Sequence, residues 1–368
     1  MKKLLVISGI AFIFGAIFAT QLGLDNDAGW GCGRITLLSC GVILCLSGLF
    51  LHTFGEKLSQ RWLKTTTAFN NAVNRDAKVS IATAISLFLV LSSYIWITQL
   101  EQRKVNNNYN YYAELASSFK NGHLYLKDQP SAALLALENP YDYSLRKQEG
   151  VEDFPWDASL YKDKFYLYWG PVPAVLLMPF SKSWLSRIET FHLALVFACG
   201  TFIYMALLTS SFWRKSRAKS PAWLLGFILI VMGFATPVMF MLKDSGIYDI
   251  AIFGAQLFFI GGCYWAYQSL SKEKLGLGLL AFASLHWALA VGTRVVILPG
   301  VGFSAGITLF FVYRRFSLKK TKESVLLLIA MSLPLAMVGV GLTYYNYARF
   351  ENWLEFGITY QLTNIDYT

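Results

Sequence analysis

Three kinds of reactive or ligand-binding side chain gather in residues 99–188 and at the edges of the apolar segments that follow. Carboxylates can take a proton from a hydroxyl group, and the candidates for this catalytic role are Asp157, Glu114 and Asp142. Arginine and lysine can hold a phosphate, arginine through two hydrogen bonds at once, and tyrosine rings offer flat apolar faces. The candidate substrate-binding residues are Lys164, Tyr166, Tyr168, Lys243, Asp249, Arg294 and Arg349.

Several of these candidates also have a purely structural interpretation. Asp142 ends the motif "NPYD" and can bond its own backbone, which is the more common role of aspartate in such a turn. Lys243 and Arg294 can extend from the ends of apolar segments to lipid headgroups, and Asp249 can pair with either of them. Arg294 has almost no loop around it in "AVGTRVV", which favours a functional role.

Spacings typical of several other enzyme classes are missing from the sequence. No Walker, zinc-ligand or Ser-His-Asp spacing occurs, so soluble-type ATP chemistry has no support. The residues name no cofactor, and they leave a divalent metal open.

The segments that must position these residues are apolar and long. The chain has 368 residues, of which 55% are apolar and only 15% charged, whereas soluble proteins have about 25% charged residues. We therefore expect an all-α, polytopic membrane protein in which each span has the roughly 20 residues that a bilayer requires. The nine expected spans are 4–20, 35–53, 79–98, 189–211, 222–242, 247–270, 276–292, 295–313 and 325–346.

The distribution of charge predicts the topology. With the N-terminus in the cytoplasm, 18 of the 32 Lys and Arg residues fall in cytoplasmic segments, against four of the 22 Asp and Glu residues. This is the positive-inside pattern, and it accounts for the net charge of +10 without nucleic acid as a partner. Residues 1–20, with a basic start and an apolar core, also fit a cleaved signal peptide, but the spans that follow directly favour an uncleaved first span.

Four regions follow from this topology. Residues 1–98 form a three-span region, 99–188 a long extracytoplasmic loop, 189–346 a helical bundle, and 347–368 an outer C-terminal segment. Within the loop, Tyr112, Leu115, Ala116 and Phe119 have the spacing of one helical face, which predicts a helix on the outer leaflet with Glu114 turned away from lipid. This helix is either an interfacial anchor or a helix that faces substrate.

A β-hairpin is expected later in the same loop. "SLY" and "KFYLYW" read as short strands joined at Lys162-Asp163, with Tyr166 and Tyr168 on one face and Phe165, Leu167 and Trp169 on the other. Such a hairpin would lie at the membrane interface. Gly170-Pro171 then begins an apolar helix that is too short to cross the bilayer.

The motifs "NPYD", "WDASLY", "KFYLYWGPVPA" and "YYNYARFENWLEFGITYQL" resemble a group of bacterial multi-pass proteins similar to the GT-C glycosyltransferases, such as protein O-mannosyltransferases and lipid A aminoarabinose transferases. The resemblance covers roughly residues 105–368. It implies an enzyme of the bacterial cytoplasmic membrane that moves a sugar from a polyprenyl-phosphate carrier to an envelope glycan, lipid or protein acceptor. In this fold an Asp or Glu of the first large outer loop acts as base.

The sequence departs from that pattern in two places. Similar proteins have an Asp before the first loop helix, where this chain has Asn106, Asn107, Asn108 and Asn110. An amide cannot act as a base, so Glu114 or Asp157 would have to serve. Similar proteins also continue with more spans beyond the C-terminal motif. Two alternatives therefore stay open, a non-catalytic or degenerate membrane protein and a transporter or polymerase of envelope glycolipids.

Overall fold

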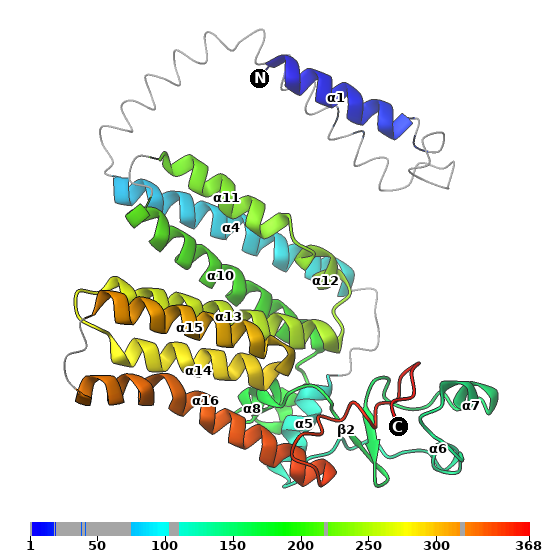
Figure 1. Ribbon diagram of the computed structural model, residues 1–368. Coiled ribbons are helices and arrows are strands. Elements are labelled where there is room, and N and C mark those ends of the chain that lie inside the picture. The colour runs from blue at the N-terminus through cyan, green and yellow to red at the C-terminus, as the bar shows by residue number, and fades with distance from the viewer. Residues whose placement is uncertain are drawn as a thin grey trace. The chain divides into compact units, whose positions relative to one another are not determined.

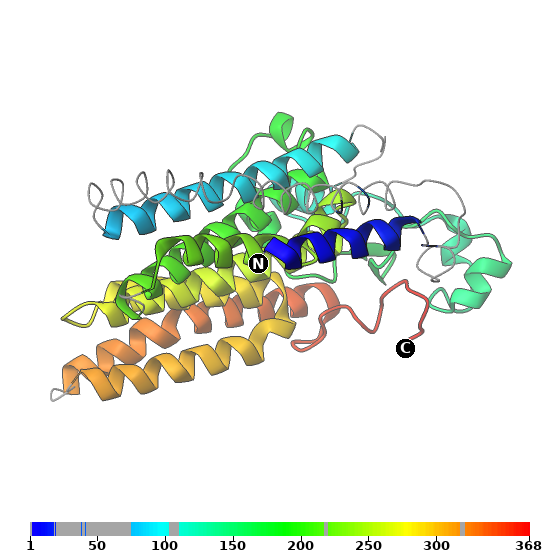
Figure 2. The same cartoon turned by 90° about the horizontal axis from the view of Figure 1, so that it is seen from above.

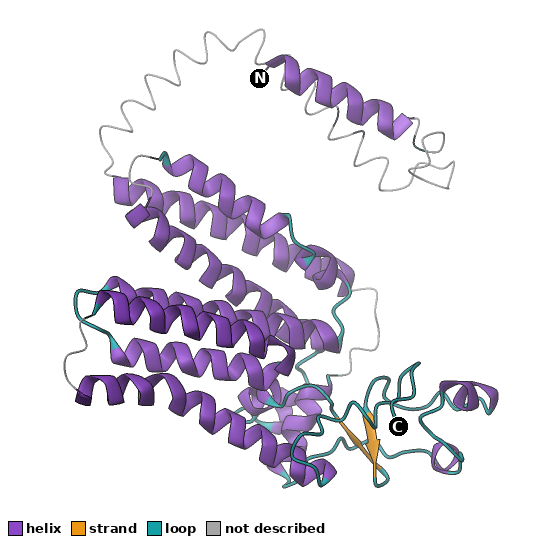
Figure 3. Cartoon of the chain, in the orientation of Figure 1, coloured by secondary structure: helices purple, strands orange, loops and turns teal. Residues whose placement is uncertain are grey.

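The structure, a computed structural model, describes residues 2–17, 19, 38, 41, 75–102, 110–216, 220–316 and 321–368. The chain forms two compact units, residues 1–78 and 79–368. The first unit contributes helix α1 (Lys2–Ile17), and the expected span 35–53 lies outside the described residues apart from positions 38 and 41. Helices dominate the rest of the chain, and one two-stranded sheet is the exception among the described residues (Figure 3).

Most of the second unit is a bundle of long helices that run side by side (Figures 1 and 2). Within the described residues, five helices are long and apolar enough to cross a membrane. The elements of the bundle are α4 (Arg75–Gln102), α10 (Thr190–Ser216), α11 (Ala222–Phe234), α12 (Val238–Lys243), α13 (Ile247–Ser271), α14 (Leu277–Thr293), the 3-10 turn η1 (Val295–Ile297), α15 (Leu298–Arg315) and α16 (Thr321–Phe350).

Five of the nine expected spans are confirmed as helices of spanning length, namely 79–98, 189–211, 247–270, 295–313 and 325–346. The expected span 222–242 is instead broken into α11 and α12 at Pro237, which has no N–H to donate and disfavours the helical conformation in the residue before it. With 13 residues, α11 is about 20 Å long. The apolar helices at 8–17 and 277–293 are likewise shorter than the five.

The bundle is built around α13 and α14. Helix α13 packs against α10 and α14, and α14 packs against α16. A small residue makes the contact between α13 and α14 possible, since a Cβ at Gly262 would lie 2.4 Å from Cδ1 of Trp287, which is itself fully buried. Close helix packing through small residues is typical of membrane bundles.

A lobe extends from one end of the bundle and contains residues 110–188 and 351–368 (Figure 1). Its two strands pair antiparallel, and the turn residues Lys162 and Asp163 both have positive φ, as a tight two-residue hairpin requires. The expected hairpin at this position is therefore confirmed. The elements of the lobe are α5 (Tyr111–Lys120), α6 (Ala132–Leu135), α7 (Tyr143–Gln148), β1 (Ser159–Tyr161), β2 (Lys164–Tyr166), α8 (Val172–Leu177) and α9 (Lys182–Leu185).

The C-terminal segment covers the hairpin. The N–H of Leu160 donates to the carbonyl of Tyr360, and the N–H of Leu362 donates to the carbonyl of Ala158, at 2.8 and 2.9 Å. Both faces of the second strand are buried, with Phe165 at 1% and Tyr166 at 7% exposure. The ring of Tyr166 packs against those of Tyr125 and Phe350, so protein contacts account for its burial, and its placement at a membrane interface stays a prediction.

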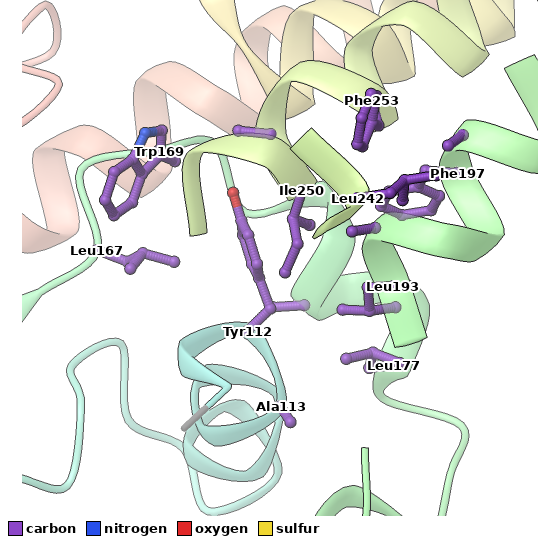
Figure 4. Close-up of a cluster of buried hydrophobic side chains, with 14 of the residues drawn as sticks. Tyr112, Ala113, Leu167, Trp169, Leu177, Leu193, Phe197, Leu242, Ile250 and Phe253 are labelled. Atoms are coloured by element: carbon purple, nitrogen blue, oxygen red, sulfur yellow. The ribbon is translucent and has the colours of Figure 1, made fainter. Parts of the chain in front are cut away.

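Helix α5 has the predicted apolar face, but the face is turned toward protein. Tyr112, Leu115 and Ala116 are fully buried, and Tyr112 lies in a cluster with Leu167, Ile250 and other apolar side chains (Figure 4). The helix packs against α8 and α9. It therefore joins the lobe to the bundle, rather than lying on a leaflet as an isolated anchor.

Candidate functional site

A cavity of about 120 Å³ opens where the lobe meets the bundle, and we call it the arginine cavity. The lobe, the segment after α14 and the last turns of α16 all contribute to its wall. It is lined by Tyr168, Trp169, Gly170, Pro171, Val291, Arg294, Val295, Val296, Leu342, Tyr345, Asn346, Arg349, Phe356 and Ile358.

The first arginine of the cavity, Arg349, is locked in place. It is 3% exposed, and its Nη1 donates to the carbonyl of Leu167 at 2.7 Å while Nη2 donates to Oδ1 of Asn346 at 2.8 Å. The guanidinium also lies over the ring of Tyr345, 3.8 Å from its centroid. These contacts tie the end of α16 to the lobe.

The second arginine, Arg294, is positioned by its backbone but not by its side chain. It ends α14 in an extended conformation. Beside it, a Cβ at Gly170 would lie only 2.1 Å from the carbonyl oxygen of Gly292, so the lobe can approach α14 this closely only through glycine. Nη1 of Arg294 is buried and has no hydrogen-bond partner among the described residues.

Two further buried donors of the same cavity make no hydrogen bond within the described parts of the chain. They are the indole Nε1 of Trp169 and the hydroxyl of Tyr345. The indole lies against Tyr168, and the phenol ring lies against Arg349. No Asp or Glu is among the residues that line the cavity. Because a buried donor without a partner costs about 1–3 kcal/mol, and more when it carries charge, this arrangement suits an anionic ligand that accepts several hydrogen bonds.

A buried carboxylate, Asp157, lies next to this cavity. It is 6% exposed, and its φ of 62° is unusual for any residue other than glycine. Its Oδ2 accepts from the hydroxyl of Tyr248 at 2.5 Å and its Oδ1 from Nε2 of Gln361 at 3.2 Å. The backbone N–H of Asp157 donates to the carbonyl of Leu362, so the C-terminal segment holds this residue at both ends.

Two aromatic residues connect Asp157 with the arginine cavity. The ring of Tyr248 meets that of Trp169 edge to face, with centroids 4.8 Å apart, and Trp169 lines the cavity. Burial raises the pKa of the Tyr168 phenol. The positive charge of Arg294 opposes this rise, and the negative charge of Asp157 adds to it. A carboxylate and a cation therefore act on one side chain at the cavity wall.

The other predicted carboxylates have structural contacts. Glu114 is buried and accepts a hydrogen bond from the backbone N–H of Lys127, which ties α5 to the segment that follows. Asp142 caps α7 by accepting from the N–H of Ser144 at 2.7 Å, as the turn interpretation predicted. Asp249 accepts from the N–H of Gly246 at 2.7 Å and so caps α13. None of the three lines the arginine cavity.

The remaining substrate-binding candidates lie at different places. Lys164 is exposed, with its ammonium 4.3 Å from the ring centroid of Tyr125. Tyr166 is buried between Tyr125 and Phe350, where burial raises the pKa of its phenol and Arg349 opposes the rise. Lys243 is exposed at the end of α12. Of the seven candidates, Tyr168, Arg294 and Arg349 line the cavity.

Sequence reasoning did not single out Tyr345 or Gln361 as site residues, and nothing in their spacing marks them. It did single out the asparagine run before α5, of which Asn110 is described. The Oδ1 of Asn110 caps the helix by accepting from the N–H groups of Tyr112 and Ala113, and its Nδ2 donates to the carbonyl of Ile188 at 3.1 Å. An ionised aspartate could not make the last bond, so the amide has a structural use here.

Among the described residues, no group of three or more His, Cys, Asp or Glu side chains could hold a metal ion. Comparison with known proteins gives no further guide to the site, because no family model, curated protein or solved structure matches this chain. The assignment of function therefore depends on the geometry of the cavity.

Proposed function

We propose that this protein is a GT-C-type membrane glycosyltransferase, in which the arginine cavity holds the phosphate of a polyprenyl-phosphate-linked sugar. One observation carries the proposal: Nη1 of Arg294 is buried without a partner, in a cavity that has two arginines and no lining carboxylate. A phosphate group offers the charge and the acceptor oxygens that such a cavity lacks. The five membrane-length helices fit a lipid-linked donor.

The proposed reaction needs one base and one leaving-group site. Asp157 would take the proton from a hydroxyl of the acceptor, whose oxygen then forms a bond to the anomeric carbon of the sugar. The bond between that carbon and the phosphate oxygen breaks, and the polyprenyl phosphate leaves with the electron pair. Tyr248 and Gln361 hold the carboxylate, and the donors of Arg294, Trp169 and Tyr345 stabilise the charge on the phosphate.

The proposal includes the topology expected from the charge distribution. The chain would lie in the bacterial cytoplasmic membrane with nine spans and a cytoplasmic N-terminus, and the lobe would face the extracytoplasmic side. The acceptor would be an envelope glycan, lipid or protein.

Binding of the carrier lipid tests the phosphate site directly. Purified protein in nanodiscs is titrated with undecaprenyl phosphate, with undecaprenol as a neutral control and inorganic phosphate as a control without a lipid chain. We expect Arg294→Ala to weaken binding of undecaprenyl phosphate by at least about 30-fold, because a charge-assisted contact to a buried group is lost. Arg187→Ala, which removes an exposed arginine outside the cavity, should leave binding unchanged. Equal binding by the Arg294→Ala variant and the wild type would refute the phosphate site.

Sugar transfer tests the role of the carboxylate. Membranes are supplied with undecaprenyl phosphate that carries radiolabelled mannose, glucose or aminoarabinose, and label in the envelope fraction is counted. We expect Asp157→Asn to reduce transfer by about 100-fold or more while the binding of undecaprenyl phosphate is retained. Transfer at the wild-type rate by this variant would remove Asp157 from the mechanism.

A further inference from the structure

An exposed group of aromatic side chains lies on the lobe, beside the buried carboxylate but facing away from it. Trp156 is 46% exposed and Tyr143 is 37% exposed. The ring of Trp156 stacks on that of Phe154, with centroids 6.0 Å apart and planes 23° apart, and Tyr143 meets it edge-on at 6.2 Å. We call these three residues the aromatic platform.

Contacts on the buried side of the platform hold it in place. The N–H of Ala158 donates to the carbonyl of Pro155 at 3.1 Å, so Trp156 and Asp157 are the central residues of a turn that directs one side chain outward and the other inward. Under the ring of Phe154 lies the guanidinium of Arg146, 5.2 Å from the centroid. Arg146 is 1% exposed and donates to the carbonyl oxygens of Pro140 and Thr363, both at 2.5 Å.

The place of the platform in the fold argues against a role as a lipid anchor. Tyr143 belongs to α7, which lies beyond the ends of the long helices in both Figure 1 and Figure 2. A second exposed pair provides a contrast: Tyr347 is in the last turn of α16, and its ring stacks on that of Trp353 at 4.4 Å. Aromatic rings at the end of a spanning helix are typical of the membrane interface, whereas a rigid aromatic surface in water is typical of a binding site.

The surroundings of the platform favour a carbohydrate. The C–H groups of a sugar ring pack on a flat aromatic face, while its hydroxyl groups need hydrogen-bonding side chains at the edge. Exposed polar residues flank the platform in the chain, namely Lys147 in α7, and Glu152 and Asp153 just before Phe154. The N–H of Phe154 donates to the carbonyl of Glu152, so the backbone turns between these acids and the ring.

We propose that the aromatic platform of Tyr143, Phe154 and Trp156 binds a saccharide chain, which in the proposed function is the glycan acceptor. As an assignment of the acceptor this rests on the proposed function, but saccharide binding can be measured without donor lipid and without transfer. Trp156 and Asp157 are adjacent in the chain, and this connects the platform with the proposed base. Because the ring faces outward and the carboxylate inward, the platform would hold the acceptor chain on the part of the lobe that carries the proposed base, and the sugar on the ring is not itself in contact with that base.

The test is saccharide binding by the full-length protein in nanodiscs. Chitohexaose, cellohexaose and mannohexaose are titrated while saturation-transfer NMR and tryptophan fluorescence are recorded. We expect at least one hexasaccharide to bind, Trp156→Ala to weaken its binding by about tenfold, and Tyr143→Ala by about threefold, since each removes one ring contact. Trp156→Phe, which keeps a flat ring, should bind within about threefold of the wild type. Trp353→Ala is the matched control and should bind like the wild type.

Three outcomes would overturn the proposal. They are the absence of binding by all three hexasaccharides, equal binding by wild type and Trp156→Ala, and a smaller brominated-lipid-quenched fluorescence in Trp156→Phe than in the wild type, which has 11 tryptophans. The last result would place the ring of Trp156 in the membrane. The melting temperature of each variant confirms that it is folded. Arg294→Ala separates this proposal from the previous one, because it should lose undecaprenyl phosphate and retain the hexasaccharide.

Discussion

The arginine cavity differs from a second cavity that lies within the helical bundle. This bundle cavity is larger, at about 310 Å³, and lies between α4, α10, α11, α12 and α13. Its walls are mostly apolar, and several of its hydroxyl groups are satisfied: Tyr94 donates to the carbonyl of Gly233 at 2.9 Å and Thr201 to that of Phe197 at 2.8 Å. The arginine cavity, in contrast, has three buried donors without a hydrogen-bond partner in the described chain. Unsatisfied polar groups, rather than volume, therefore indicate where a ligand belongs.

We expect the largest effect on stability from a substitution at the contact between the lobe and α14. In Gly170→Ala the new Cβ would lie 2.1 Å from the carbonyl oxygen of Gly292, so one of the two backbones, both at the arginine cavity, would have to shift. We expect a loss of more than about 3 kcal/mol in the free energy of unfolding, seen as a lower melting temperature or failure to fold. Gly306→Ala is the control, because a Cβ there meets nothing within 4 Å. Similar melting temperatures for the two variants would contradict the close contact.

A smaller effect on stability is expected when the arginines of the cavity are replaced, and it should differ between the two. Arg349→Ala leaves the carbonyl of Leu167 and Oδ1 of Asn346 without their donor, so we expect it to lower the free energy of unfolding by about 3 kcal/mol. Arg294→Ala removes a buried donor that makes no hydrogen bond within the described residues, so it should leave the free energy of unfolding unchanged or raise it. Thermal unfolding in detergent measures both. An equal loss in the two variants would show that Arg294 is also a structural residue.

We expect the smallest effect on stability from a substitution in the bundle cavity. Ala198 lines this cavity, and Ala198→Val adds two methyl groups to space that is already apolar. We expect a change in stability within about 1 kcal/mol and no change in the binding of undecaprenyl phosphate. A strong loss of binding in this variant would mean that the bundle cavity also contacts the ligand, and it would remove the distinction between the two cavities.

Particular residues show how far the sequence could lead. The spacing of Tyr112, Leu115 and Ala116 predicted a helix with one apolar face, and α5 has that face, but its pattern could not distinguish burial by lipid from burial by protein. Asp157 stood out as one of several carboxylates. In the structure Asp157 is distinguished by its contacts with Gln361 and Leu362 of the C-terminal segment. Asp142 and Asp249 instead cap nearby helices.

The sequence by itself determined the apolar helices of membrane length, the hairpin turn at Lys162 and Asp163, and the set of charged residues from which a site could be built. These are local properties, since a run of apolar residues and a turn depend on neighbours in the chain. Tertiary structure alone decided that Arg294 and Arg349 share one cavity with Trp169 and Tyr345, and that Asp157 lies beside it. Those contacts join residues far apart in the sequence, and they depend on packing that no local pattern encodes.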